Sequence, residues 1–451
     1  MKIIIVGIGK LGEYLTRNLV KENNEITVID NDYTTSKDLI NNVDVNYVDG
    51  SGMDPNVLIE AGVKSADLVI SVMDKDESNI MCSLLSKKLG AKNTIARIRG
   101  LEYSNMINTL KEELGLSMTI NPELLTANHV TSALSIPSVL ESTSFFKGKI
   151  NMVSLKVKEK GKLEGLTLTN LLKKCNTKII VCLIERNGEM LIPKGSTRIE
   201  KNDKIHIVGT IKEIKDFLEF ASLKEEKTEK IIICGGSKTA VYLAKNLLDL
   251  KMQVKIIEID PERCKVLSEI LPKALIINGD ISDQNILYEE GIDTCDAFIP
   301  LTSIDEENIV YSMFASMRGV PRIITKVNHI DLDGIVEKAN VDTVITPHRI
   351  AANQIIKYVR AMQNKKLSSC EAVYKFEDDK FEMIEFNVKE DFKAKNTKIK
   401  DMKLRDNILI VSILRGRNII TPNGNEVIKK NDTVVIIDGT DSVNNINDIL
   451  E

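Results

Sequence analysis

A glycine-rich turn near the start of the chain is the feature with the clearest chemistry. Residues 7–12 have the sequence GIGKLG, between a β-branched run at 3–6 and a helical pattern at 11–20. In such a strand–turn–helix unit, the first glycine permits a tight turn, the second lets backbone approach a pyrophosphate, and the third packs helix against strand. The helix N-terminus adds N–H donors and a partial positive charge. The predicted diphosphate-binding residues are therefore Gly7, Ile8, Gly9, Lys10, Leu11 and Gly12.

An acidic residue follows this turn at the spacing that dinucleotide binding requires. Asp30 ends the next strand-like run, at residues 25–29, and lies 18 residues after Gly12. A carboxylate there accepts hydrogen bonds from the adenosine ribose and repels a 2′-phosphate, which favours NAD over NADP. The alternative is a glycine turn kept only for packing, and the presence of the acid argues against it.

Four further candidates follow other predicted strands, at the carboxyl edge where open α/β sheets bind ligands. They are Ser51, Met73, Asp74 and Arg97. Arg97 could neutralise a diphosphate or triphosphate; its alternative role is a surface arginine paired with a neighbouring carboxylate. Met73 could equally be a packing residue.

The same segment occurs twice in the chain. KIIIVGIGKLGEYLTRNL at 2–19 returns as KIIICGGSKTAVYLAKNL at 230–247, with ten of the 18 positions identical. Ordinary unrelated segments would share roughly one position. The second copy supplies the candidate binding residues Gly235, Gly236, Lys238, Glu258 and Asp280.

The second copy departs from the glycine pattern at two positions. Ser237 replaces Gly9, and Ala240 replaces Gly12. Alanine is tolerated at the last position, whereas serine places a Cβ where the diphosphate should lie. Lys326 matches Arg97 and retains its charge without the bidentate fork. A second nucleotide site, a weak site, and a site for a smaller ligand such as AMP all remain open.

Strand-like and helical patterns alternate within each copy, which predicts an α/β fold with a doubly wound, Rossmann-like parallel sheet. Each copy is followed by about 80 residues of short alternating strands, predicted to form a small α+β domain. A polar stretch at 224–230 is the predicted linker between the halves. The predicted domains are residues 1–123, 138–222, 229–348 and 367–451.

Composition excludes several classes of protein. The net charge is −4 with no basic stripe, which argues against nucleic-acid binding, and no run of about 18 apolar residues is present. Seven cysteines without a C-x-x-C pair indicate reduced, mostly buried thiols in a cytosolic protein, and the four histidines lack metal-ligand spacing.

No catalytic set accompanies the glycine turns. A dehydrogenase needs an acid or base near the nicotinamide, usually from a separate substrate domain, and the 80-residue segments are too short to supply one. Binding without chemistry is the favoured interpretation. A soluble NAD-dependent oxidoreductase and an oligomeric scaffold with vestigial folds are the alternatives.

The whole chain resembles the TrkA family, the regulatory subunits of bacterial Trk potassium uptake, in which RCK N-terminal and RCK C-terminal domains alternate. The motifs that support the resemblance lie at residues 6–12, 28–30, 49–52, 66–67, 76–79 and 95–98. The resemblance implies binding of NAD⁺ or NADH, and of ATP or ADP, in the first fold. It also implies a homotetrameric ring, a TrkH-type membrane subunit as partner, and a cytoplasmic location at the inner face of the membrane. The departure at Ser237 and Ala240 leaves the second site in doubt.

Overall fold

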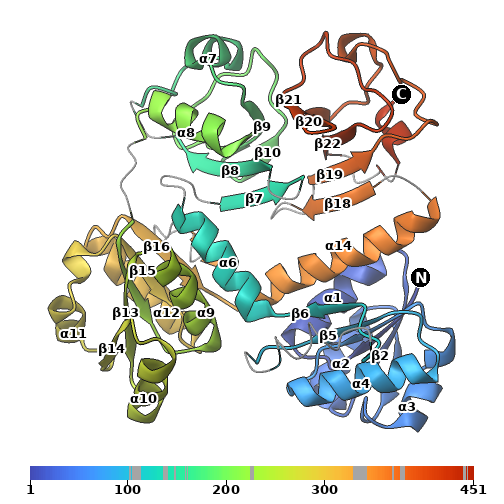
Figure 1. Ribbon diagram of the computed structural model, residues 1–451, viewed down its shortest axis with the longest axis vertical. Coiled ribbons are helices and arrows are strands. Elements are labelled where there is room, and N and C mark those ends of the chain that lie inside the picture. Colours follow the sequence, from blue (N-terminus) through green and yellow to red (C-terminus); the bar gives the residue numbers. More distant parts are fainter. Residues whose placement is uncertain are drawn as a thin grey trace. The chain divides into compact units, whose positions relative to one another are not determined.

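The computed structural model divides into two compact units (Figure 1). One contains Met1–Val130 and Glu229–Ile356, and the other contains Thr131–Thr228 and Lys357–Glu451. The structure describes residues 1–100, 103, 113–135, 141–146, 149–157, 159, 161–223, 228–328, 343–367, 370–375, 381–439, 443 and 445–451.

The first unit contains two parallel six-stranded sheets with the same strand order. The first sheet has the order β3-β2-β1-β4-β5-β6. Its strands are β1 (Lys2–Val6), β2 (Glu25–Asp30), β3 (Asn46–Asp49), β4 (Leu68–Ser71), β5 (Thr94–Arg97) and β6 (Met118–Ile120). The accompanying helices are α1 (Lys10–Lys21), α2 (Tyr33–Asn42), α3 (Pro55–Glu60), α4 (Asp76–Leu89) and α6 (Pro122–Ser135).

The second sheet repeats this plan as β14-β13-β12-β15-β16-β17. Its strands are β12 (Lys230–Cys234), β13 (Gln253–Glu258), β14 (Leu275–Asn278), β15 (Ala297–Pro300), β16 (Arg322–Lys326) and β17 (Thr343–Ile345). The helices are α9 (Lys238–Asp249), α10 (Pro261–Ile270), α11 (Gln284–Glu289), α12 (Asp305–Met317) and α14 (Pro347–Leu367). We call the two domains the first and second Rossmann folds.

Burial on both faces explains why the central strands are continuous apolar runs. All residues of β1 after Lys2 are buried, as parallel strands covered by helices on both faces must be. One face carries Ile4 and Val6, which belong to a core that also contains Leu58 of α3 and Cys82 of α4. This core holds β1 against α3 and α4. It thereby positions the carboxyl end of β1, where the glycine turn begins.

The second unit contains two antiparallel five-stranded sheets. The first has the order β10-β9-β11-β8-β7 and the second the order β18-β19-β22-β20-β21. The first is formed by β7 (Glu141–Phe145), β8 (Ile150–Lys156), β9 (Ile180–Arg186), β10 (Glu189–Leu191) and β11 (Lys204–Gly209), with α7 (Leu168–Cys175) and α8 (Ile211–Phe220). The second is formed by β18 (Cys370–Lys375), β19 (Glu382–Asn387), β20 (Ile408–Arg415), β21 (Asn418–Ile420) and β22 (Thr433–Asp438).

A repeated ion pair stabilises the same point of both antiparallel domains. Arg186 donates from Nε and Nη2 to the two carboxylate oxygens of Asp203, at 2.9 and 2.8 Å. Arg415 binds Asp432 in the same bidentate way, with both distances at 2.9 Å. Both aspartates are buried, and a paired arginine offsets much of the cost of removing them from water.

The structure confirms the predicted fold class, duplicated Rossmann-like sheets that each precede a small α+β domain. Part of the linker predicted at 224–230 lies outside the described residues. His329, one of the four histidines, also lies outside them. The six described cysteines are buried and form no disulfide. Within the described part of the chain, no helix is both long and apolar enough to cross a bilayer.

Candidate functional site

The first glycine turn brings β1, α1 and β4 into close contact. Gly7 has φ +96°, and a Cβ there would lie 2.9 Å from the Met73 nitrogen. A Cβ on Gly12 would lie 2.0 Å from the Gly7 oxygen, so only glycine fits this helix against this turn. The tight-turn and packing roles predicted for these two glycines therefore match their surroundings.

The position of Gly9 differs, because a Cβ there would meet no protein atom within 4 Å. Gly9 is the N-cap of α1, and no side chain caps this helix end. The first N–H groups of a helix need partners, and their partial positive charge favours an anion. Open space beside an uncapped helix N-terminus is the geometry that a diphosphate requires.

Asp30 holds the turn from the neighbouring strand. Its carboxylate accepts the Ile8 N–H at 2.5 Å through Oδ2 and the Asp32 N–H at 2.9 Å through Oδ1. Each carboxylate oxygen can accept a second hydrogen bond, so Asp30 retains capacity for ribose hydroxyls. The predicted pairing of glycine turn and acid thus places both groups at one sheet edge.

Arg97 lies at the same edge and is largely buried. Its Nη2 donates to the Met73 oxygen at 2.6 Å. The same nitrogen lies 3.4 Å from Oδ1 of Asp74, a fully exposed carboxylate that forms only a weak ion pair. The Nε atom is buried without a hydrogen-bond partner. Burial, followed by the charge of Arg99, lowers the pKa of Arg97. A buried donor without a partner is unusual, and an anionic ligand would satisfy it.

The remaining candidates of the first fold contribute less. Ser51 uses its hydroxyl to accept the Met53 N–H at 3.2 Å. Met73 contributes its main chain, because its oxygen binds Arg97 and its nitrogen lies against Gly7. The glycine turn, Asp30, Met73 and Arg97 thus converge at one edge, whereas the Asp74 side chain points into solvent.

Sequence reasoning assigned no function to Asn79, which lies in the motif at residues 76–79. Asn79 is fully buried, and its side chain binds Met73 and Arg97. The signal that could have identified it is its recurrence as Asn308 at the same place in the repeat.

The second glycine turn keeps the backbone but fills the ligand space differently. Gly235 has φ +95°, and Gly236 donates its N–H to Glu258 Oε2 at 2.5 Å, as Ile8 does to Asp30. Ser237, however, caps α9 by accepting the Ala240 N–H at 3.3 Å. Arg263 donates from Nε to the Gly236 oxygen at 2.7 Å. The serine therefore adds a Cβ at the turn and also occupies a helix N–H.

The acidic residues around the second crevice are placed differently. Asp280 and Glu307 stand where the first fold has Ser51 and Ser78. Burial, and then the carboxylates of Glu307 and Asp280, raise the pKa of Tyr311, so both carboxylates lie near this phenol. Lys326 is half-buried, and its partial removal from water lowers its pKa.

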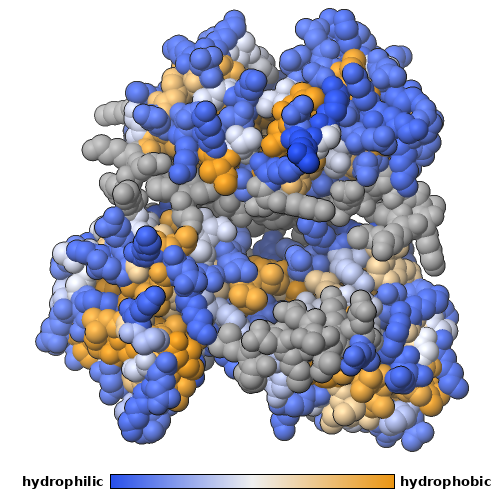
Figure 2. All heavy atoms as spheres, viewed as in Figure 1, coloured by the Kyte–Doolittle hydropathy of each residue, from blue (hydrophilic) through white to orange (hydrophobic). Residues whose placement is uncertain are grey.

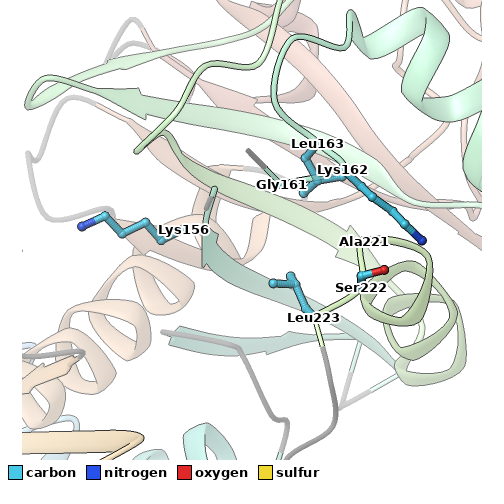
Figure 3. Close-up of a pocket in the computed structure, with 7 residues that line it drawn as sticks. All are labelled: Lys156, Gly161, Lys162, Leu163, Ala221, Ser222 and Leu223. Carbon is cyan, nitrogen blue, oxygen red and sulfur yellow. The ribbon is translucent and has the colours of Figure 1, made fainter. Parts of the chain in front are cut away.

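Other possible sites are weaker. No three His, Cys, Asp or Glu side chains of the described chain form a metal-binding group. A pocket of about 210 Å³ lies in the first antiparallel domain (Figure 3). Two of its lining residues, Lys156 and Lys162, point away from each other in this view and form no anion cradle.

Comparison with known proteins gives the same domain pattern. The TrkA-N domain family matches residues 3–122 and 231–347, and the TrkA-C domain family matches residues 152–222 and 383–450. The Trk system potassium uptake protein TrkA of Haemophilus influenzae is 31% identical over 97% of this chain and 95% of its own length. The TrkA homolog of Archaeoglobus fulgidus is 29% identical over the full length of both chains.

Two solved structures share the fold at low sequence identity. The GsuK RCK domain has a TM-score of 0.65 and 19% identity, and the match covers 97% of this chain and 92% of that one. The GsuK channel bound to NAD has a TM-score of 0.65 and 17% identity, covering 98% and 77% of the two chains.

Proposed function

The chain belongs to the TrkA family of potassium-uptake proteins, and from that premise we propose that it is the nucleotide-sensing regulatory subunit of a Trk-type transporter. The names of its relatives describe a transport system and not a reaction, and the role of the chain is to regulate potassium transport rather than to catalyse. The sensing site that we propose is the first glycine turn.

The observation that supports this site most directly is the open, uncapped start of α1 at Gly9. The diphosphate of NAD would bind the N–H groups there, Asp30 would bind the adenosine ribose, and the unpartnered Arg97 Nε would face negative charge. The residues present therefore fit NAD⁺ or NADH. A nucleotide supplies charge and binding energy here, and the chain's own groups hold and orient it.

ATP and ADP are the further ligands that we propose for this site. They share the adenosine and diphosphate with NAD and lack the nicotinamide half. Arg97 lies at the carboxyl end of β5, beyond the glycine turn, and its guanidinium suits terminal phosphate oxygens. Exchange between NADH and ATP would then alter contacts at Arg97 while Asp30 keeps the adenosine in place.

We further propose that copies of the chain assemble into a ring, with four copies as the expected number. The helix α12 exposes Val310, Met313 and Met317 at 60%, 44% and 83%, on one stripe of the helix. Ile304 and Tyr288 are also exposed. Figure 2 shows hydrophobic surface gathered over the part of the chain that forms the second Rossmann fold. Exposed apolar patches of this kind mark interaction surfaces.

A ring gives a physical reason for regulation. A ligand shifts a conformational equilibrium only through its different affinities for the two states. A tenfold preference contributes about 1.4 kcal/mol, and four coupled sites would contribute about 5.6 kcal/mol. This is close to the ~5.5 kcal/mol that moves a population from 1:99 to 99:1. We propose that the ring thereby controls a TrkH-type membrane subunit from the inner face of the membrane.

Potassium flux tests this function. Vesicles containing the matching TrkH-type subunit would receive the wild-type chain, Asp30→Ala, or Glu258→Ala as the matched control in the second fold. We expect NADH and ATP to change the flux with wild type and with Glu258→Ala, but not with Asp30→Ala. The same nucleotide response from Asp30→Ala would contradict the proposal.

A further inference from the structure

A buried amide joins two strand ends of the first nucleotide site. Asn79 lies on α4 with no exposed surface. Its Oδ1 accepts the Met73 N–H at 2.7 Å, and its Nδ2 donates to the Met73 and Arg97 oxygens at 2.8 and 2.9 Å. The side chain therefore fixes the residues that follow β4 to the end of β5.

These bonds place the Arg97 guanidinium relative to the glycine turn. The Met73 oxygen that accepts from Asn79 also accepts from Arg97 Nη2, at 2.6 Å. The Met73 nitrogen lies against Gly7, where an added Cβ would be only 2.9 Å away. Asn79 thus holds the main chain of Arg97 and also the peptide that binds its side chain.

We propose that Asn79 is a positioning residue of the first nucleotide site, which sets the distance from Arg97 to the glycine turn and so the preference for terminal phosphates. This inference rests on the proposed function. It predicts that loss of the amide weakens binding of a triphosphate more than binding of a monophosphate, because only the longer ligand extends to Arg97.

The chemistry requires asparagine at this position. Aspartate has nearly the same shape and could still accept the Met73 N–H, but its oxygens cannot donate to two carbonyl groups. Asn79→Asp would direct a buried carboxylate at the Met73 and Arg97 oxygens, which is unfavourable. The peptide segments would separate, and Arg97 would move with them.

The second fold supplies a matched control. Asn308 is also fully buried and donates to the Thr302 and Lys326 oxygens, at 3.3 and 3.1 Å. Its Oδ1 accepts both the Thr302 N–H and hydroxyl. Asn308→Asp therefore removes similar hydrogen bonds from the second fold and leaves the position of Arg97 unchanged.

The test is calorimetric titration of the full chain with ATP and with AMP, together with thermal unfolding. For Asn79→Asp we expect ATP affinity to fall about tenfold and AMP affinity to fall less than about threefold. For Asn308→Asp we expect a similar loss of thermal stability and unchanged affinity for both nucleotides. Equal losses for ATP and AMP in Asn79→Asp would overturn the inference, as would the same losses in Asn308→Asp.

A double-mutant cycle provides the test if Asn79→Asp does not fold. Asn79→Ser retains one hydroxyl donor and should lower ATP affinity by an intermediate amount. In an Arg97→Ala background, Asn79→Ser should cause no further loss of ATP affinity, because the residue acts through Arg97. An additive loss would contradict the inference. The proposed function itself fails separately, if wild type binds neither nucleotide or if Asp30→Ala binds both normally.

Discussion

The two Rossmann folds share their strand order and the hydrogen bond from a turn N–H to an acidic residue, but the helix that follows each glycine turn is capped differently. The first leaves the end of α1 uncapped beside open space at Gly9. The second caps α9 with Ser237 and places Arg263 on the Gly236 oxygen. The first turn therefore leaves the N–H groups at the start of α1 without a side-chain partner, whereas in the second turn Ser237 accepts one of the N–H groups of α9.

The positions of the acidic residues also differ between the two crevices. Asp280 and Glu307 stand where the first fold has Ser51 and Ser78, whereas Asn278 and Ser303 stand where it has Asp49 and Asp74. We infer that the first fold is the sensor and the second its structural partner.

The largest expected effect concerns the exposed apolar stripe on α12 of the second fold, formed by Val310, Met313 and Met317. Val310→Glu combined with Met317→Glu should dissociate the proposed ring into smaller species, because each buried carboxylate would cost several kcal/mol. Light scattering after size-exclusion chromatography measures the mass. Met53→Glu, at an exposed methionine of the first fold, is the control and should leave the mass unchanged. An intact ring in the double variant would exclude α12 from the interface.

The next effect is a loss of stability at Gly12, the third glycine of the first turn. Gly12→Ala should lower the free energy of unfolding by about 2 kcal/mol, because the new Cβ would lie 2.0 Å from the Gly7 oxygen. It should also weaken nucleotide binding, since α1 must move away from the turn. Ala240→Gly should leave binding unchanged. Chemical denaturation and nucleotide titration check both, and a fully stable Gly12→Ala would show that the turn tolerates a wider spacing.

A gain of nucleotide binding by the second fold is the next expected effect. The triple variant Ser237→Gly, Asp280→Ser and Glu307→Ser gives the second crevice the first fold's residues at these three positions. Removing each carboxylate should strengthen diphosphate binding roughly tenfold, and removing the serine frees a helix N–H. Titration should then detect a second site per chain. If none appears, these three positions do not account for the difference between the two crevices.

The smallest effect is a pH dependence of stability at Lys326, the counterpart of Arg97. Burial lowers the pKa of this lysine, so the folded state holds its proton less tightly than the unfolded state. The cost of the buried charge is present below the folded pKa and disappears as pH rises from that value to the unfolded pKa of about 10.5. Wild type should therefore gain stability relative to Lys326→Met over this range, by at most about 1.4 kcal/mol per pH unit. The same difference in free energy of unfolding between wild type and Lys326→Met at pH 8 and at pH 10 would contradict this.

Local features of the site could be predicted from the sequence, because they depend on short-range geometry. The spacing of Gly7, Gly12 and Asp30 implies a strand, a turn, a helix and a second strand in fixed order. The structure then places the Asp30 carboxylate on the Ile8 N–H. The same reasoning identified Glu258 for the second fold, which binds Gly236 in the same way.

Tertiary contacts could not be predicted in this way. Arg263 binds Gly236 from a different helix, and nothing in local periodicity indicates that contact. Asn79 resembles any polar residue of an amphipathic helix until burial shows that its amide joins two strand ends. For Ser237 we expected a Cβ in the path of the diphosphate, and its role as the cap of α9 became evident only from the helix start.

The most direct test of the account is the stoichiometry of nucleotide binding. The purified chain would be titrated calorimetrically with NADH, NAD⁺, ATP and ADP, alongside Asp30→Ala and Glu258→Ala. If the first fold is the sensor, we expect one site per chain, lost in Asp30→Ala and retained in Glu258→Ala. Two equivalent sites per chain, or binding that survives in Asp30→Ala, would contradict the assignment of the first fold as the sensor.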